Sequence, residues 1–168
     1  AVRAATDGYY LLPDGMRVDW SASVAAAIAA SVSIPPDLQL PKSPDRTHAV
    51  TTVTGANETT LGAAHRLLQQ GLRPAALNMA NGVQPGGGFL GGARAQEEAL
   101  CRSSALHATL VDDPMYAAHR RAGDYESSAW IILSPDVPVF RADNGDNLPA
   151  PWPCTFLTSA APYAPFAL

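Results

Sequence analysis

The stretch "NMANGVQPGGGFLGGARAQEEALCRSSAL" (Asn78–Leu106) places six of the chain's 13 glycines within eleven residues, followed closely by two adjacent glutamates. The segment that leads into it, "PAALNMA" (Pro74–Ala80), is a short apolar run without alternation. Such a run predicts a central strand buried on both faces. Beyond the glycines, apolar spacing predicts a helix from about Ala95 to Val111. The stretch therefore predicts a strand, a glycine loop and a helix.

The preceding segment supplies a second strand and a helix. "HAVTTVT" (His48–Thr54) is rich in β-branched residues and predicts a strand. Leu61, Ala64 and Leu68 fall on one helical face, and Gly71 stands where a C-cap glycine belongs. With Pro74–Ala80 these segments predict a right-handed βαβ unit with parallel strands.

The N-terminal segment predicts a hairpin and a short helix. "YYLL" and "MRVDW" flank the turn residues Pro13–Gly15. Ser21 is a candidate N-cap for an alanine-rich helix that continues to about Val32 and is ended by the pair Pro35-Pro36. A proline-rich loop over Gln39–Arg46 follows.

The C-terminal part predicts short strands. "SAWIILS" (Ser128–Ser134), "VPVFR" (Val137–Arg141) and "PCTFLTS" (Pro153–Ser159) have strand composition, and Pro138 favours an edge position. "DNGDNLPAPW" (Asp143–Trp152) is predicted to be a loop. The pattern as a whole predicts one layered α/β domain.

Composition narrows the class of protein. A chain of 168 residues with 47% hydrophobic and 15% charged residues is typical of a single globular domain. The net charge of -4, with ten scattered arginines and one lysine, argues against binding nucleic acid through its backbone. No apolar run reaches membrane-spanning length. Cys101 and Cys154 follow no disulfide framework, which favours reduced thiols in a cytoplasmic protein.

The glycine loop predicts a site for an anion. Glycines allow close approach of a ligand to the backbone, and a loop ahead of a helix N-terminus presents several N–H donors for phosphate or pyrophosphate. The loop has no Gly-Lys-Ser/Thr ending and no Gly-x-Gly-x-x-Gly spacing, which argues against a P-loop and a dinucleotide fingerprint. The alternative interpretation is a flexible connection.

The two glutamates have a structural and a chemical interpretation. Glu97 and Glu98 lie in the first helical turn, and neither belongs to the predicted inward stripe of Ala95, Ala99, Ser103, Leu106 and Leu110. Taken alone, the two negative charges would stabilise the helix by interacting with the positive end of its dipole. Beside a phosphate site, carboxylates can accept hydrogen bonds from ribose hydroxyls, and a carboxylic acid can protonate a leaving oxygen. Because successive helical residues point about 100° apart, only one should address that oxygen.

The segment "GGGFLGGARAQEE" (Gly86–Glu98) resembles the signature of poly(ADP-ribose) glycohydrolases. "LNMANGVQP", "ALCRSSAL", "SPDVPVFR" and "TFLTSAAPYA" are also similar to segments of the bacterial-type members. The resemblance spans about His48 to Ala164. It implies a macrodomain-like α/β fold, in which a mixed β-sheet is sandwiched between helices in three α/β/α layers. It further implies binding of ADP-ribose and hydrolysis of ribose–ribose O-glycosidic bonds in poly(ADP-ribose).

By the same resemblance, Glu98 is the catalytic acid and Glu97 binds ribose hydroxyls. The resemblance implies that the glycines contact the diphosphate and the distal ribose, and that Asn81 also contacts the distal ribose. It further implies that Gln96 braces the loop and that Phe89 lines the pocket. The implied substrate-binding residues are Asn81, Gly86, Gly87, Gly88, Phe89 and Gln96. The charge of Glu97 favours a protonated Glu98, whereas the helix N-terminus opposes it.

No metal or cofactor is expected, because His48, His65, His107 and His119 form no ligand cluster with acids at metal spacing. The expected substrates are poly(ADP-ribose) or ADP-ribosylated proteins, and the expected product is ADP-ribose. No membrane and no sequence-specific nucleic acid is expected as a partner. We expect one macrodomain-like catalytic domain over residues 1–168, with residues 1–46 as an N-terminal extension packed on it. Family members continue past the position of Ala164 with a strand and a second phosphate loop, so the C-terminal part of the family domain is expected to be absent.

Three other functions remain open at this point. A macrodomain can bind ADP-ribose without cutting it, and the same acid could hydrolyse a mono-ADP-ribosyl adduct. The third is a structural protein whose acids only stabilise a helix. The Glu97–Glu98 pair favours an enzyme, because a non-catalytic binding module has little use for it.

Overall fold

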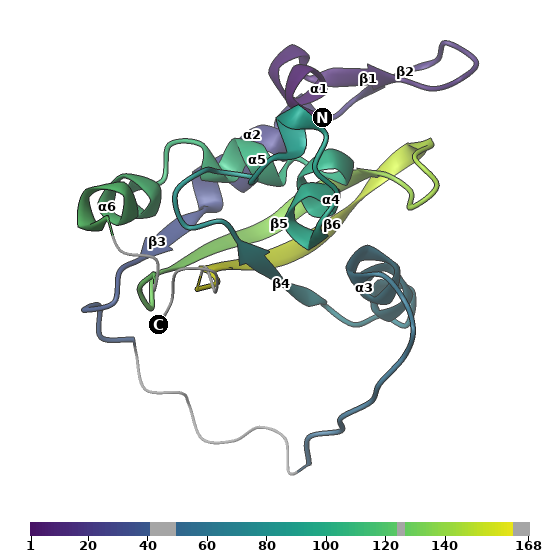
Figure 1. Ribbon diagram of the computed structural model, residues 1–168. Coiled ribbons are helices and arrows are strands. Elements are labelled where there is room, and N and C mark those ends of the chain that lie inside the picture. Colours follow the sequence, from purple (N-terminus) through teal and green to yellow (C-terminus); the bar gives the residue numbers. More distant parts are fainter. Residues whose placement is uncertain (41–49, 124–126, 163–168) are drawn as a thin grey trace.

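The computed structural model describes residues 1–40, 50–123 and 127–162, and its main feature there is a four-stranded mixed sheet (Figure 1). The strand order is β3-β5-β6-β4. β4 runs parallel to β6, whereas β3 and β6 are both antiparallel to β5. The strands are β3 (Val32–Ile34), β4 (Ala75–Ala80), β5 (Ile131–Arg141) and β6 (Asn147–Ala160).

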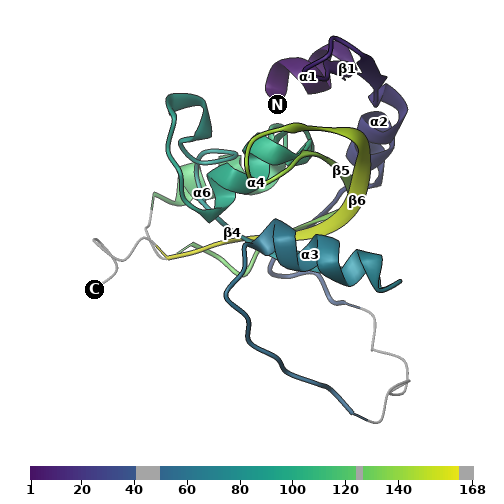
Figure 2. The same ribbon diagram turned by 90° about the vertical axis from the view of Figure 1, so that its right-hand side faces the viewer.

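Helices cover both faces of this sheet, as predicted for a layered α/β domain. Figure 2 shows the long strands β5 and β6 curving around α4, with α3 below them on the opposite side. The helices are α1 (Val2–Asp7), α2 (Ser21–Ala30), α3 (Thr60–Gln69), α4 (Gln96–Ser103), α5 (Leu106–Leu110) and α6 (Pro114–Ala122), with a short 3-10 turn, η1, at Phe89–Gly91. The core between the layers is built on β5 and β6, where Ile132, Val139 and Phe156 are completely buried.

The predicted N-terminal hairpin is confirmed and is joined to the core by aromatic rings. β1 (Tyr9–Leu11) and β2 (Arg17–Asp19) pair in antiparallel fashion. The Trp20 ring centroid lies 5.4 Å from that of Tyr10 and 4.6 Å from that of Phe140 in β5. This contact ties the first twenty residues to the central sheet.

The helix expected from Ser21 to about Val32 is shorter than predicted. It ends at Ala30, and Val32–Ile34 instead form β3 against β5. Ser21 is the first helical residue rather than the N-cap, and Asp19 accepts its N–H at 3.0 Å. Alanine spacing could not reveal this end, because the neighbouring strand that captures Val32–Ile34 comes from a distant part of the sequence.

The strand predicted over His48–Thr54 is wrong where it can be judged. His48 and Ala49 lie outside the described residues, and residues 50–54 form no strand. Val50 and Val53 are 79% and 90% exposed. β-Branched residues favour a strand only where a neighbouring strand can pair with them, and the described part of the chain places no strand beside residues 50–54. The predicted βαβ unit is therefore not formed, and the parallel neighbour of β4 is β6.

The helix and strand predicted next are present, but the strand has a different place. In α3, Leu61 and Ala64 are buried as expected, Leu68 is partly exposed, and Gly71 has the positive φ of a C′ glycine (78°). β4 is the last strand of the order rather than a central one, and its burial alternates. Leu77 and Met79 face outward, so the prediction of burial on both faces is wrong.

The single helix predicted over Ala95–Val111 is broken into α4 and α5 at Ser104. The Ser104 hydroxyl donates to the Leu100 carbonyl at 2.7 Å and accepts the Leu106 N–H at 3.1 Å. The Ala105 N–H leaves the helical pattern and donates to the carbonyl of Pro138 at 3.0 Å. A side chain that competes for backbone groups therefore redirects the chain onto β5.

The C-terminal strands are longer than predicted. Residues 128–134 and 137–141 contribute to one strand, β5, which begins at Ile131 and has an irregularity between Ser134 and Val137. The predicted loop over Asp143–Trp152 is wrong from Asn147, where β6 begins. β5 is an inner strand, but β3 pairs only with residues 131–133, so at Pro138 β6 is its strand neighbour on one side and the α4–α5 junction contacts it on the other, where Ala105 donates to the Pro138 carbonyl. This local edge accommodates the proline.

Candidate functional site

The glycine loop and the first turn of α4 are held together by the two glutamates. Glu97 accepts the Asn81 N–H through Oε2 at 2.8 Å and the Gly86 N–H through Oε1 at 3.1 Å. Glu98 accepts the Gly88 N–H through Oε1 at 3.0 Å. Its other oxygen, Oε2, is buried and has no hydrogen-bond partner among the described residues. Glu97 is thus fully bound by the loop, whereas Glu98 keeps one oxygen for another group.

Both glutamates are buried, which corrects the predicted orientation of this helix. Glu97 is 4% and Glu98 8% exposed, and they share the buried face of α4 with Leu100 and Cys101. Ala99, expected to face inward, is exposed. Carboxylates can point inward here because backbone N–H groups replace the water that they lose.

Gly87 allows the loop to pass directly over the carboxylates. Its φ is 55°, and a Cβ at this position would overlap Oε1 of Glu98 and lie 2.9 Å from Oε2 of Glu97. Gly86 also has a positive φ, 73°, and a Cβ there would press on the Phe89 ring at 2.9 Å. Both positions therefore require glycine, for conformation and for space.

The amides of the three consecutive glycines already have partners inside the chain. Gly86 and Gly88 donate to the two glutamates, and Gly87 donates to the carbonyl of Gln84 at 3.0 Å. The acceptors that occupy these amides are therefore Glu97, Glu98 and the Gln84 carbonyl. Contact of these glycines with a ligand diphosphate stays a prediction.

The environment of Glu97 favours its protonated form. Burial raises the pKa of Glu97 to about 7. Hydrogen bonding from Asn81 and from the Asn78 side chain opposes this rise in pKa, and the neighbouring charge of Glu98 adds to it. Asn78 is itself buried in β4, where its amide nitrogen donates to the Thr158 hydroxyl at 3.2 Å.

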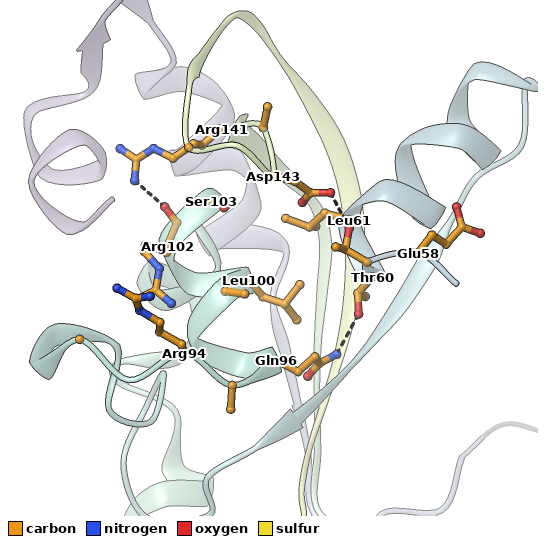
Figure 3. A pocket seen from close by; sticks show the side chains of 16 residues that line it. Glu58, Thr60, Leu61, Arg94, Gln96, Leu100, Arg102, Ser103, Arg141 and Asp143 are labelled. Atoms are coloured by element: carbon orange, nitrogen blue, oxygen red, sulfur yellow. Dashed lines mark hydrogen bonds between the residues drawn. The ribbon is translucent and has the colours of Figure 1, made fainter. Parts of the chain in front are cut away.

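Gln96 and Phe89 brace the site from outside it. Gln96 accepts the Met79 N–H at 3.0 Å and donates to the Leu77 carbonyl at 2.6 Å, so its amide pairs with β4 as a strand neighbour would. Figure 3 shows the same side chain directed toward Thr60. Phe89 is buried, and its ring centroid lies 5.0 Å from that of His107. The predicted bracing role of Gln96 fits these contacts, although they are made to β4 rather than to the loop.

A pocket of about 600 Å³ lies at the end of β4 and includes Asn81, Glu97 and Glu98. The backbone N–H groups of Val83 and Gln84 both donate to Oδ1 of Asn81 at 2.9 Å, which fixes the Asn81 side chain. Gly86, Gly87, Gly88, Phe89 and Gln96 are not among the lining residues. The pocket is lined by Met79, Ala80, Asn81, Gly82, Val83, Ala95, Glu97, Glu98, His119, Arg120, Gly123, Ser127, Ala161 and Pro162.

Two lining residues from α6, His119 and Arg120, were not predicted as site residues. The Arg120 guanidinium donates to the Val83 carbonyl at 2.6 Å. Nδ1 of His119 lies 3.0 Å from the Gly82 carbonyl, which can only accept, so Nδ1 donates there; Nε2 lies 2.6 Å from the Ser128 hydroxyl. Nothing in their local sequence marks these residues, because folding alone brings α6 to the loop.

Across residues 1–40, 50–123 and 127–162, no three His, Cys, Asp or Glu side chains are grouped as metal ligands would be. No helix within these ranges has the length and apolar character needed to cross a membrane. The charged and titratable side chains that line the pocket are those of Glu97, Glu98, His119 and Arg120, and Oε2 of Glu98 has no hydrogen-bond partner among the described residues.

Comparison with known proteins gives consistent matches. The family model described as "Microbial-type PARG, catalytic domain" matches residues 1–142. The structure of poly(ADP-ribose) glycohydrolase (PARG) from Thermomonospora curvata is 40% identical, with a TM-score of 0.85, and the match covers 96% of this chain and 61% of that one. PARG from Deinococcus radiodurans in complex with ADP-ribose is 37% identical, with a TM-score of 0.73, and the match covers 84% of this chain and 58% of that one. No curated protein matches the chain.

Proposed function

The chain belongs to the family of microbial-type PARG catalytic domains, and from this premise we propose that it hydrolyses ribose–ribose O-glycosidic bonds of poly(ADP-ribose) and releases ADP-ribose. The mixed sheet with helices on both faces matches the fold of the PARG structures. One observation carries the proposal within the site. Glu98 lines the pocket, is anchored through one oxygen, and has no partner for the other among the described residues.

In the proposed reaction, Glu98 acts first as an acid. It protonates the glycosidic oxygen, the leaving ribose departs, and the remaining sugar passes through an oxocarbenium-like state. Water then attacks the anomeric carbon, and the ionised Glu98 accepts a proton from it. The hydrogen bond from Gly88 to Oε1 keeps the carboxyl group oriented in both steps, while Oε2 exchanges the proton.

Glu97 has a supporting part in this proposal. Both of its oxygens accept loop amides, so its main effect is to hold the loop segment Asn81–Gly86 against α4. As a lining residue it also meets the ribose whose bond is cut. Its fixed position orients that sugar toward Glu98.

The proposed substrate contacts divide between the pocket and the loop. Asn81 lines the pocket beside the glutamates and would contact the distal ribose. We assign Gly86, Gly87 and Gly88 to the path of the diphosphate and distal ribose, where their bare Cα atoms permit close approach. Phe89 and Gln96 support this loop and the edge of β4 from behind. Arg120 supplies the positive charge that the occupied glycine amides do not.

The wider setting follows the same proposal. The chain belongs to one macrodomain-like catalytic domain, and its described N-terminal residues pack as part of it rather than as an extension, because β3 pairs with β5 in the central sheet. The described contact of Trp20 with Phe140 supports this packing. The protein is cytoplasmic, which its two free, buried cysteines support. Its substrates are the polymer and proteins that carry it.

The variant Glu98→Gln tests the proposed function. It keeps the acceptor for the Gly88 N–H but cannot donate a proton as an acid, so release of ADP-ribose from the polymer should fall by at least about 100-fold. Calorimetry with ADP-ribose should give nearly unchanged binding. Near-normal turnover by this variant would show that Glu98 is not the acid.

The parent protein separates the competing functions. ADP-ribose binding without release from the polymer would identify a non-catalytic binding module. Faster turnover of mono-ADP-ribosylated protein than of polymer would identify a hydrolase of such adducts. A flat calorimetric trace with ADP-ribose would leave only a structural role.

A further inference from the structure

A second pocket, of about 700 Å³, lies between α4, the start of α3 and the turn that joins β5 to β6 (Figure 3). α4 contributes Gln96, Ala99 and Arg102 to it, whereas Glu97 and Glu98 line the first pocket. The two pockets therefore use different faces of the same helix. Nothing in the proposed hydrolysis requires the second one.

Three arginines line this second pocket: Arg94, Arg102 and Arg141. The ion pairs found among the described residues involve other arginines, namely Arg3, Arg17, Arg66 and Arg73. Arg102 donates to the Ala93 carbonyl at 3.0 Å. Arg141 donates to the Arg102 carbonyl and to the Asn147 side chain, both at 3.1 Å. These neutral acceptors position the guanidinium groups and leave most of their N–H donors unused by the described residues. The Arg141 guanidinium also lies over the Phe140 ring, 4.7 Å from its centroid, and the ion pairs among the described residues do not include Arg102 or Arg141.

The carboxylates of the pocket are engaged with other partners. Glu58 forms two hydrogen bonds with Arg66, which is not a lining residue. Asp143 accepts the Thr59 hydroxyl at 2.6 Å. The acidic and basic groups of the pocket thus remain unpaired with one another, and the arginines are available to an external anion.

The positive charge of Arg102 near Arg141 has an electrostatic cost. Arg141 is partly buried, and burial together with the nearby charge of Arg102 lowers the pKa of Arg141. An anion placed between the two would remove this repulsion and occupy the free N–H donors. Phosphate suits this arrangement, because a guanidinium group presents paired donors that match two phosphate oxygens.

We propose that this pocket, lined by Arg94, Arg102 and Arg141, is a second ligand site that binds a pyrophosphate group. Thr60 and Ser103 also line it, and their hydroxyl groups can hydrogen-bond to the hydroxyls of an attached sugar. The pyrophosphate belongs either to a free nucleotide or to a further unit of a polymer whose end occupies the first pocket. Both sources present the same charged group to the arginines.

Titration of the full-length protein with inorganic pyrophosphate, followed by calorimetry at low salt, tests the site. Arg94→Gln is the first variant, because Arg94 is exposed and makes no side-chain hydrogen bond within the described ranges. The double variant Arg102→Gln/Arg141→Gln is the second, and its thermal transition is measured alongside. Affinity for pyrophosphate should fall several-fold in the first and by at least roughly tenfold in the second. Arg102→Lys/Arg141→Lys keeps the charge and should retain an intermediate affinity.

Two matched controls locate the anion. Arg73→Gln removes an equally charged but exposed side chain at the far end of β4 and should leave the affinity unchanged. Arg120→Gln removes the arginine that lines the first pocket, so it tests whether pyrophosphate binds there instead. If pyrophosphate binding is lost in Arg120→Gln and kept in the variants of Arg94, Arg102 and Arg141, the anion occupies the first pocket and the proposal is wrong. Equal affinity in the parent and in Arg94→Gln and the double Gln variant would overturn it too.

Two further titrations identify the source of the pyrophosphate. Both ADP and a short ADP-ribose polymer are titrated into the Glu98→Gln protein. If ADP binds as tightly as the polymer, the ligand of the second pocket is a free nucleotide. If the polymer binds at least about tenfold more tightly than ADP, and Arg94→Gln removes this difference in affinity, one polymer occupies both pockets and the second pocket holds a further unit of it. Failure of polymer hydrolysis would not affect the pyrophosphate result, so the two proposals fail separately.

Discussion

Gly88 donates its backbone N–H to Oε1 of Glu98 at 3.0 Å, so the glycine loop holds the proposed catalytic acid directly. The neighbouring Gly86 does the same for Glu97 at 3.1 Å. The N–H groups of Gly86 and Gly88 therefore bind the two carboxyl groups of the protein itself. Any ligand that enters the pocket meets acids whose orientation is already set before it binds.

Gly87→Ala should disrupt this arrangement. The substitution places a methyl group against both carboxylates at a residue with φ of 55°. We expect a loss of about 1–3 kcal/mol in the free energy of unfolding and a fall in kcat of at least roughly tenfold. Gly91→Ala is the matched control, because a Cβ there meets no atom within 4 Å. Equal kinetics in the two variants would contradict the role given to Gly87.

Glu97 should make stability depend on pH. Burial raises the pKa of Glu97 from 4.5 to about 7, so the folded state binds a proton more tightly than the unfolded state does. This contribution is fully present below pH 4.5 and is lost as the pH rises through 7. The free energy of unfolding of the parent, minus that of Glu97→Gln, should fall by about 2 kcal/mol between pH 5.5 and pH 8. Urea denaturation at both pH values measures it, and a flat or rising difference would show that the burial of Glu97 is compensated.

Arg120→Gln should weaken substrate binding more than it slows the chemistry. Arg120 lines the pocket and donates to the Val83 carbonyl, and the ion pairs found among the described residues include none between Arg120 and either glutamate. We expect KM for the polymer to rise by roughly tenfold, with a smaller change in kcat. The adjacent Arg121, exposed and outside the pocket, is the control for a lost charge. An equal rise in KM for Arg121→Gln would indicate general electrostatic attraction instead.

Trp20→Ala should show that the N-terminal segment is part of the folded unit. Trp20 is 2% exposed, packs on Phe140, and donates its indole N–H to the Ala4 carbonyl at 2.9 Å. The free energy of unfolding should fall by about 3–5 kcal/mol, measured by denaturant titration. Leu11→Ala, at an exposed hairpin position, should change it by less than about 0.5 kcal/mol. A small effect of Trp20→Ala would mean that residues 1–20 fold separately.

Sequence patterns predicted the elements whose signals are local. The Pro13–Gly15 turn, the helix that contains Leu61 and Ala64, and the strand at Ala75–Ala80 are formed by the residues that the pattern indicated, although that strand is the last of the sheet rather than a central one. The sequence also singled out the adjacent glutamates after the glycines; both accept N–H groups of the loop, and their catalytic role stays a prediction. Where neighbouring residues in the sequence determine an element, the local pattern was sufficient to predict that element.

The errors occur where distant segments decide. A helical wheel placed Glu97 and Glu98 away from the core, since it could not include the amides of Asn81, Gly86 and Gly88 that compensate their burial. Val50 and Val53 look like strand residues but have no strand beside them. His119 and Arg120 enter the pocket because α6 packs beside the loop.

The anchoring of Glu98 affects the cost of ionising it. A carboxyl group that has given up its proton is a stronger acceptor, so the hydrogen bond from Gly88 strengthens as the proposed acid transfers its proton. The backbone thus responds to the new negative charge without moving and without waiting for solvent to reorient. Part of the barrier that a buried acid would otherwise face is removed when the loop folds, before any substrate arrives.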